Sequence, residues 1–233
     1  LVVLGMGGFV TGPGGVVSRL LGKPLCIHEQ NAYAGMTNRW LSRFANLVME
    51  AFPNSFSGRS GTVVTGNPVR NEIAALAEPA QRFTGHVGPL RLLVLGRSLG
   101  AQALNDAVSA ALALIDSAQR PQVRHQTGSK NLDSAQLAYR RTAGDVDAEV
   151  VPFIDDMAAA YCWADLVLCR AGAITISELP AAGVGSILVP FPYAVDDHQT
   201  VNARFLEQAG AGMLIPQQEL TPQRLAELLS SFT

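Results

Sequence analysis

Short apolar runs rich in β-branched residues alternate along this chain with longer stretches of helical periodicity. Glycine or proline bounds most of the apolar runs, which is typical of strands that end in turns. Parallel strands cannot be joined by a tight hairpin, so each needs a crossover, which is usually a helix. The alternation therefore predicts an α/β protein built on parallel, doubly wound sheets.

The alternation falls into two series. The first predicts strands at 1–4, 24–28, 46–49 and 62–65, with helices at 13–21 and 36–44. The second predicts strands at 90–95, 123–126, 149–151, 166–169 and 186–189, with helices at 101–118, 131–141, 155–163, 174–182 and 198–209 and from 221 onward. Two such sheets that face each other place the carboxyl ends of their strands around a shared cleft, where ligands bind in these folds.

Turn-rich sequence marks the change from one series to the other, with glycine and serine at 57–61. We place the domain boundary after residue 67, which gives a partial N-terminal domain at 1–67 and a second Rossmann-like domain at 68–233. Proline, glycine and polar residues at 79–89 favour a linker or surface loop. Because the chain starts within an apolar run and ends within a helical pattern, we interpret it as a fragment whose first domain is incomplete.

Composition narrows the functional classes. A hydrophobic content of 48% argues against disorder, and a formal net charge of -2 gives no general attraction to nucleic acid. No apolar run reaches the roughly 20 residues that span a bilayer, and no signal-peptide pattern opens the chain. Cys26, Cys162 and Cys169 lack the paired spacing of a disulfide or zinc framework. We expect them to be buried thiols of a protein in the reducing cytosol.

Glycine-bearing turns follow three of the apolar runs, at 5–8, 96–100 and 170–173. Small residues let an anion approach the backbone, and the helix that follows aims N–H groups at it. Each turn alone is better explained as a tight connection from strand to helix, and none has the Walker or dinucleotide pattern. Three of them across two sheets favour a ligand that carries a diphosphate.

Polar residues stand at the expected ligand-binding edge of both sheets. Residues 28–31 directly follow an apolar strand, although they also suit the cap of the next helix. Glu178 lies on the helix after the turn at 170–173, where a carboxylate can accept hydrogen bonds from a ribose diol; a solvated acid near a helix N-terminus is the alternative. Gln199 carries an amide suited to sugar hydroxyls, whereas the aspartates at 196–197 are as readily helix caps.

Several strings of this sequence are similar, in the same order, to the peptidoglycan N-acetylglucosaminyltransferases of glycosyltransferase family 28. They are GMGGFVTGPGG at 5–15, HEQN at 28–31, GNPVR at 66–70, FIDDM at 153–157, RAGA at 170–173 with Ser177 and Glu178, and DHQ at 197–199. Together they span nearly the whole chain, so the resemblance is specific.

The resemblance implies the GT-B architecture, in which two Rossmann-like domains face a cleft. It also implies an inverting transfer of N-acetylglucosamine from UDP-N-acetylglucosamine to the 4-hydroxyl of the muramoyl sugar on lipid I, the undecaprenyl-diphosphate-linked acceptor. The product is lipid II of peptidoglycan synthesis. UDP leaves as the acceptor hydroxyl attacks, and oriented amides and helix N-termini can stabilise the leaving diphosphate, so no cofactor and no fixed metal ion are expected.

The same resemblance implies which residues line the donor site. The backbone near Ile154 would face the uracil, Glu178 the ribose and Gln199 the sugar hydroxyls, while Ser98 and the glycine-loop amides would face the diphosphate. The full set is Asn31, Arg70, Ser98, Ile154, Ala173, Ile174, Thr175, Ile176, Ser177, Glu178 and Gln199. His28 and Glu29 are candidates for the general base near the acceptor hydroxyl, and a base in a segment before residue 1 is the alternative.

Two features depart from the family pattern. The glycine-rich N-terminal loop with its histidine is absent, so a protein of only these residues is expected to be inactive or nearly so. The family usually has two glycines and then serine in the second-domain loop, where this chain has Arg97 between Gly96 and Ser98. A side chain there either crowds the diphosphate or, when turned outward, adds positive charge.

A lipid-linked acceptor implies a peripheral protein at the cytoplasmic face of the inner membrane. Such attachment usually needs an apolar patch with basic neighbours, and Trp40 with Arg39 and Arg43 is a feature of this kind; a tryptophan buried on a helix is the alternative. Two other functions stay open. One is a different UDP-sugar enzyme of the GT-B architecture, such as a glycolipid galactosyltransferase or a UDP-N-acetylglucosamine epimerase, and the other is a non-catalytic fragment that binds UDP-sugar.

Overall fold

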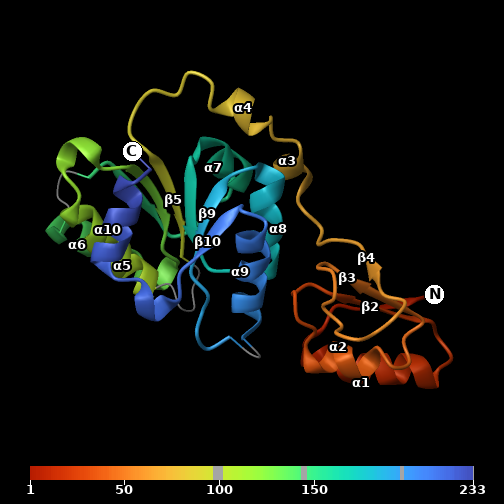
Figure 1. Cartoon of the computed structure of the whole chain (residues 1–233). Coiled ribbons are helices and arrows are strands. Elements are labelled where there is room, and N and C mark those ends of the chain that lie inside the picture. The colour runs from red at the N-terminus through yellow and green to blue at the C-terminus, as the bar shows by residue number, and fades with distance from the viewer. Residues whose placement is uncertain (97–101, 143–145, 195–196, 233) are drawn as a thin grey trace.

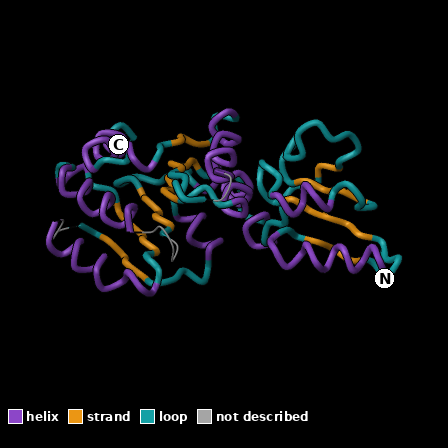
Figure 2. Tube along the Cα trace, turned by 90° about the horizontal axis from the view of Figure 1, so that it is seen from below, coloured by secondary structure: helices purple, strands orange, loops and turns teal. Residues whose placement is uncertain are grey.

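The structure is a computed structural model that describes the whole chain except residues 97–101, 143–145, 195–196 and 233. Within the described residues the strands form two separate sheets, and every strand pairing recorded in them is parallel. Figures 1 and 2 show two lobes side by side, each with its own sheet and helices. The α/β class and the parallel sheets predicted from the alternation are therefore confirmed.

The first lobe is a four-stranded sheet in the order β1-β2-β3-β4 with two helices. Its elements are β1 (Val3–Gly5), α1 (Gly8–Leu20), β2 (Leu25–Glu29), α2 (Met36–Leu41), β3 (Leu47–Glu50) and β4 (Val63–Val64). Leu25 and Ile27 of β2 are fully buried and pack with Leu41 of α2 and Phe56 in a small core. This core fixes the loops that leave the carboxyl ends of β2 and β3.

The second lobe has six strands in the order β10-β9-β8-β5-β6-β7. The strands are β5 (Arg91–Leu95), β6 (Gln122–Gln126), β7 (Ala148–Val151), β8 (Leu166–Cys169), β9 (Gly185–Leu188) and β10 (Gly212–Leu214). The longer helices are α5 (Gln102–Leu114), α6 (Leu132–Thr142), α7 (Met157–Trp163), α8 (Ala173–Ala182), α9 (His198–Gln208) and α10 (Pro222–Ser230), with short 3-10 turns at Ser117–Gln119, Ser129–Asn131 and Gln217–Glu219. The chain winds outward in both directions from β5, so β5 and β8 flank the point where strand order reverses.

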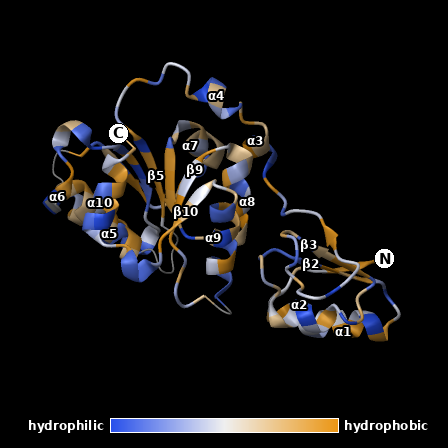
Figure 3. Ribbon diagram, in the orientation of Figure 1, coloured by the Kyte–Doolittle hydropathy of each residue, from blue (hydrophilic) through white to orange (hydrophobic). Residues whose placement is uncertain are grey.

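Alternate residues of the central strand β5 pack into two apolar clusters, one on each face of the sheet. Leu92 and Val94 pack in one cluster, whereas Leu93 and Leu95 pack in the other. This is expected because successive strand side chains point to opposite faces and a parallel sheet is covered by helices on both. Figure 3 shows the resulting hydrophobic colour along β5. Buried on both sides, the sheet is a rigid base for the loops at its carboxyl edge.

The segment at 79–89 lies at the surface, as predicted, because none of its described residues is buried. It is nevertheless attached to the second lobe. Two short helices, α3 (Asn71–Ala74) and α4 (Pro79–Arg82), fall in the stretch between the sheets. Ile73 of α3 is buried in the same cluster as Leu93 of β5. The sequence gives little sign of these helices because each has only four residues, too few for an apolar period to show.

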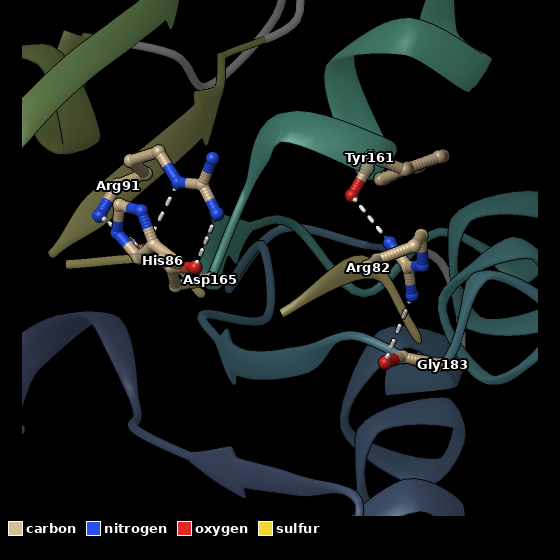
Figure 4. A network of polar contacts seen from close by, with 6 residues as sticks. All are labelled: Arg82, His86, Arg91, Tyr161, Asp165 and Gly183. Carbon is tan, nitrogen blue, oxygen red and sulfur yellow. Dashed lines mark hydrogen bonds and ion pairs between the residues drawn. The ribbon is translucent and has the colours of Figure 1, made fainter. Parts of the chain in front are cut away.

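Polar contacts hold the α4 segment in place (Figure 4). Arg82 donates to the main-chain oxygen of Tyr161 at 3.1 Å and also to those of Ala182 and Gly183. Farther along, Asp165 pairs with His86 at 3.3 Å and with Arg91 at 2.9 Å. The chain from α3 to β5 is thus part of the second lobe, and the placement of the domain boundary after residue 67 stays a prediction.

Other expectations need correction at single elements. Helix α1 starts at Gly8 rather than at Pro13, which lies inside the helix, so the usual preference of proline for a first turn misplaced the start. Strand β10 was not expected, because a three-residue edge strand that begins with glycine carries almost no pattern. Of the cysteines expected to be buried, Cys162 is exposed and Cys26 only partly buried, whereas Cys169 is buried.

Exposure at α2 decides between the two interpretations of Trp40. The residue is 47% exposed, so the alternative of a tryptophan buried in the core is wrong. Arg39 and Arg43 beside it are also exposed. None of the helices in the described part of the chain is long and apolar enough to cross a membrane.

Candidate functional site

A cleft of about 710 Å³ opens at the carboxyl ends of β5, β6 and β8. Leu95, Gln126 and Cys169, the last residues of these strands, all line it. This is the crevice where strand order reverses, the usual ligand site of open parallel sheets. The other walls come from the start of α8, from α7 and its preceding loop, from α9, and from Pro68 and Arg70 of the connecting segment.

Glu178 is the buried acid of the cleft, with its side chain 7% exposed. Arg70 donates to Oε1 from Nε at 3.1 Å and from Nη2 at 3.0 Å, and the Tyr161 hydroxyl donates to Oε2 at 3.1 Å. These partners offset the cost of taking a carboxylate out of water. The Arg70 side chain is 49% exposed. Its guanidinium is therefore partly solvated and can leave Glu178 to bind another anion.

Tyr161 stays protonated in this environment. Burial raises the pKa of its hydroxyl, and interactions with the neighbouring Cys169 and Glu178 raise it further. A hydroxyl that keeps its proton serves as a donor, which matches its hydrogen bond to Glu178. One acceptor position of Oε2 is therefore already used, and a carboxylate offers about four in all.

Residues 173–178 divide among three environments. Ile174, Thr175 and Glu178 line the cleft, as does Gly172, the cap residue of α8. Ile176 is 1% exposed and packs in the core. Ala173 and Ser177 meet the first lobe instead, because Asn67 donates to the Ser177 hydroxyl at 3.0 Å and to the Ala173 carbonyl at 3.4 Å. The N-terminus of α8 thus faces the cleft with its free amides.

Ile154 and Gln199 also line the cleft, and each is held by a hydrogen bond. The Ile154 N–H donates to Oε1 of Gln126 at 3.0 Å. Oε1 of Gln199 accepts from the Phe191 N–H at 2.9 Å, and among the described residues its amino group has no partner. Gln199 is therefore oriented by the β9–α9 loop and keeps two donors for a ligand.

The two candidates for the general base lie in the first lobe, and neither lines the cleft. Glu29 is 3% exposed and accepts four hydrogen bonds, from the Asn31 N–H and side chain, the Gly35 N–H and the Asn38 side chain, at 2.8 to 3.2 Å. All its acceptor positions are filled, so Glu29 holds the loop after β2 in shape.

His28 is 7% exposed and is bonded at both ring nitrogens. Nε2 lies 3.0 Å from the Gly66 carbonyl and 3.1 Å from the Thr65 hydroxyl, and Nδ1 lies 3.3 Å from Nε2 of Gln30. A carbonyl can only accept, so Nε2 carries the proton and Nδ1 is the acceptor. Its contact with Gln30 is long, so Nδ1 is the less firmly held nitrogen of the two.

Asn31 belongs to the junction between the lobes. Its Oδ1 accepts from Asn202 of α9 at 3.1 Å. Asn202, fully buried, also donates to the Ala171 carbonyl at 3.1 Å and accepts from the Ala32 N–H at 2.8 Å. Asn202 was not expected from the sequence, although it lies about one turn beyond Gln199 on the same helix.

Two further residues of the site were missed. Tyr161 falls in the helix predicted at 155–163 and was not among the residues predicted to line the site. Arg170 directly follows β8, where only the glycine of its turn was considered. It is 6% exposed, donates to the carbonyls of Val189 and Pro190 and to Gln217, and burial lowers its pKa to about 10. It therefore ties the end of β8 to the end of β9.

Ser98, with Arg97 beside it, lies outside the described residues, so the predicted contact of this loop with a diphosphate stays a prediction. No group of three or more histidine, cysteine or acidic side chains within the described residues is arranged to hold a metal ion.

Comparison with known families gives two matches. The glycosyltransferase family 28 C-terminal domain matches residues 91–233, and the family's N-terminal domain matches residues 1–50. Together they cover the greater part of both lobes.

Curated relatives carry one common name, that of the UDP-N-acetylglucosamine–N-acetylmuramyl-(pentapeptide) pyrophosphoryl-undecaprenol N-acetylglucosamine transferase. The protein of Marinobacter nauticus is 62% identical over 97% of this chain, and that of Ralstonia nicotianae is 55% identical over 100% of it. The chain spans 62% and 63% of the length of these two relatives.

Solved structures agree on the fold. MurG of Acinetobacter baumannii superimposes with a TM-score of 0.87 at 42% identity, over 99% of this chain and 64% of that protein. MnaA of S. aureus, solved with UDP, superimposes with a TM-score of 0.65 at 16% identity, over 98% of this chain and 66% of that protein, which shows a common fold only. The predicted architecture of two Rossmann-like domains is thereby confirmed.

Proposed function

Because the chain belongs to glycosyltransferase family 28, we propose that it carries the donor site of an inverting N-acetylglucosaminyltransferase. The donor is UDP-N-acetylglucosamine, the acceptor is the 4-hydroxyl of the muramoyl sugar of lipid I, and the product is lipid II of peptidoglycan synthesis. The observation that carries this proposal is the buried acid Glu178 in the cleft at the strand reversal, one turn inside a helix whose N-terminus faces the same space.

The proposed donor pose follows from the chemistry of the cleft walls. The ribose diol donates to Glu178, and the diphosphate lies at the N-terminus of α8, where free amides and the helix dipole favour negative charge. The uracil packs near Ile154, and the amino group of Gln199 donates to a sugar hydroxyl. As the sugar is transferred, charge grows on the diphosphate, which fixed amides stabilise without having to reorganise.

In this proposal Arg70 changes partners when the donor binds. It occupies two acceptor positions on Oε1 of Glu178, and Tyr161 occupies one on Oε2. Since a carboxylate has about four positions, a diol that donates twice needs one of those held by Arg70. The half-exposed guanidinium then turns toward the diphosphate, which it can bind as a fork.

For the general base, the geometry ranks His28 ahead of Glu29. A base must accept the proton of the acceptor hydroxyl within hydrogen-bond reach. All acceptor positions of Glu29 are filled, whereas Nδ1 of His28 has one long contact with Gln30 at 3.3 Å. We therefore propose that Glu29 positions the loop of Asn31 and that His28 is the better candidate to take the proton.

We also propose that the first lobe rests on the cytoplasmic face of the inner membrane. Five side chains of α1 and its end are apolar and at least half exposed: Phe9, Val10, Val17, Leu20 and Leu21. Both acids of residues 1–67, Glu29 and Glu50, are buried, so the exposed charges of this part are its five arginines and lysines. An apolar face with basic neighbours suits an anionic bilayer surface.

The experiment that tests the donor assignment is calorimetric titration of this chain with UDP-N-acetylglucosamine, with GDP-mannose as the control. Saturable binding of the uridine nucleotide and none of the guanosine nucleotide is expected, since the proposal places a uracil at Ile154. Equal binding of both would reject a uridine-specific cleft. Incubation with UDP-N-acetylglucosamine alone, followed by product analysis, tests the epimerase alternative, because conversion of the donor without an acceptor would identify an epimerase.

A further inference from the structure

A second cavity, of about 760 Å³, lies in the first lobe between α2 and the loop that follows β3. We call it the arginine pocket, because Arg39, Arg43 and Arg59 all line it. Its other polar walls are the hydroxyls of Tyr33 and of four serines, and none of the described residues that line it is acidic. It shares no lining residue with the cleft of the second lobe.

In the described structure, no acidic side chain of the first lobe pairs with the arginines of this pocket. The two acids of residues 1–67, Glu29 and Glu50, are 3% and 2% exposed and are occupied by hydrogen bonds from their own loops. Within the described part of the chain, the guanidinium groups of Arg43 and Arg59 have neither a hydrogen bond nor an ion pair. Three like charges around one cavity repel each other, and an anion placed among them removes that cost.

Two of the walls are already shaped to receive an anion. Arg39 donates to the Tyr33 hydroxyl at 2.8 Å and lies 5.0 Å from the centre of its ring, so its guanidinium is held in place. The hydroxyl proton of Tyr33 is left to donate elsewhere. Arg59 stands in a turn between Gly58 and Gly61, whose φ angles of 77° and 79° suit glycine.

We propose that the arginine pocket binds a phosphate group with at least two negative charges. Guanidinium groups present paired N–H donors that match phosphate oxygens, and hydroxyls complete the set. A single carboxylate would balance only one of the three cations. The phosphate belongs either to a soluble molecule, such as pyrophosphate or a phosphate monoester, or to the headgroup of a lipid. The site is separate from the donor cleft, and its lipid-headgroup form rests on the proposed attachment of the first lobe to the membrane.

The first arm of the test uses a soluble probe. Pyrophosphate is titrated by calorimetry, at fixed ionic strength, into the unaltered chain and into the variants Arg43→Gln and Arg59→Gln. Loss of one charged donor should weaken binding about tenfold or more. Arg19→Gln is the matched control, because Arg19 is an exposed arginine of the same lobe outside the pocket, and its affinity should not change. Arg70→Gln removes a cation of the donor cleft and should leave this binding event in place.

The second arm uses phosphatidylcholine vesicles with and without phosphatidic acid in a sedimentation assay. In this arm the control is Arg140→Gln, because Arg140 is an exposed arginine on α6 of the second lobe. If pyrophosphate does not bind but phosphatidic acid does, and Arg43→Gln and Arg59→Gln weaken the binding while Arg140→Gln does not, the ligand is a lipid headgroup. Three results would overturn the proposal. They are no binding in either arm, an equal loss with the control variant of that arm, and a loss with Arg70→Gln but not with the pocket variants.

Discussion

At the scale of single residues, the sequence predicted some of the side chains that line the cleft and missed others. Glu178 was expected at a ligand site, and it lines the cleft as a buried acid with two partners. Its partner Tyr161 was not expected, because a tyrosine in an apolar helix has the same pattern as a packing residue. A hydroxyl that reaches across from another helix depends on the tertiary fold, which a local pattern does not contain.

Replacing Glu178 by glutamine should weaken UDP-N-acetylglucosamine binding about 10- to 100-fold, since hydrogen bonds to a charged acceptor are worth about 1.5–3 kcal/mol. Calorimetry measures the change. Glu149→Gln is the control, because Glu149 is an acid with a 59% exposed side chain, paired with Arg124 outside the cleft. An unchanged affinity of the Glu178 variant would remove the ribose assignment.

His125 is the second residue with a testable consequence. It is fully buried between the Tyr139 hydroxyl and the Asn105 carbonyl oxygen, each at 2.9 Å, and burial lowers its pKa from 6.5 to about 3. The unfolded chain takes up a proton below pH 6.5, whereas the folded chain does not until about pH 3. This histidine therefore contributes stability above pH 6.5 that is lost as the pH falls.

Between pH 6.5 and 5 the free energy of unfolding should fall by about 2 kcal/mol on account of His125, at about 1.36 kcal/mol per pH unit. Urea unfolding at several pH values measures this slope. His125→Gln should be less stable at pH 7, because buried partners lose their hydrogen bonds, and its stability should change less with pH. Equal slopes in the two proteins would show that His125 does not titrate as its burial requires.

At the scale of elements, periodicity and turn chemistry located most strands and helices of both lobes. What they missed was short: α3 and α4 have four residues each and β10 has three. Such elements are stabilised by what they pack against, as Ile73 of α3 is by the second core. The candidate site also has a predictable and an unpredictable part. The start of α8 could be predicted from a local turn. The contact of Arg70 with Glu178 could not, because it joins residues far apart in the sequence.

The end of α8 offers a matched pair of substitutions. Gly183 caps the helix with a φ of 59°, and a Cβ there would lie 2.6 Å from Cγ of Pro79 in α4. Gly210 follows α9 with a φ of 70°, and no atom of the described residues lies within 4 Å of such a Cβ. Both alanine variants bear the cost of a left-handed residue, about 1–2 kcal/mol. Only Gly183→Ala should also loosen α4, so its melting temperature should be the lower of the two. Equal melting temperatures would contradict the packing of α4 on α8.

At the scale of the whole molecule, helix α9 joins the cleft of the second lobe to the first lobe. Its first turn carries Gln199, and farther along it Asn202 bonds to Asn31 and Ala32 while Phe205 packs edge-on against Phe52 with ring centres 4.9 Å apart. Polar residues were predicted at the ends of strands in both lobes, but the contact of Asn31 with Asn202 was not. The relative placement of two domains depends on long-range contacts, which a local pattern does not contain.

Asn202→Ala should loosen the junction without unfolding either lobe. Amide hydrogen exchange of residues 30–35 is expected to rise, since the Ala32 N–H loses its acceptor and Asn31 loses a donor. Affinity for UDP-N-acetylglucosamine should change little. Asn131→Ala removes a hydrogen bond to Thr127 within the second lobe and should leave exchange at 30–35 as it was. An unchanged exchange rate in the Asn202 variant would mean that other contacts hold the lobes together.

The most direct measurement of the central claim is a crystal structure of this chain with UDP-N-acetylglucosamine bound. The account predicts the uridine between Ile154 and Glu178, with its ribose hydroxyls on the Glu178 carboxylate, Arg70 turned away from that acid, and the diphosphate at the N-terminus of α8. A nucleotide bound in the arginine pocket alone, or a ribose that makes no contact with Glu178, would contradict it.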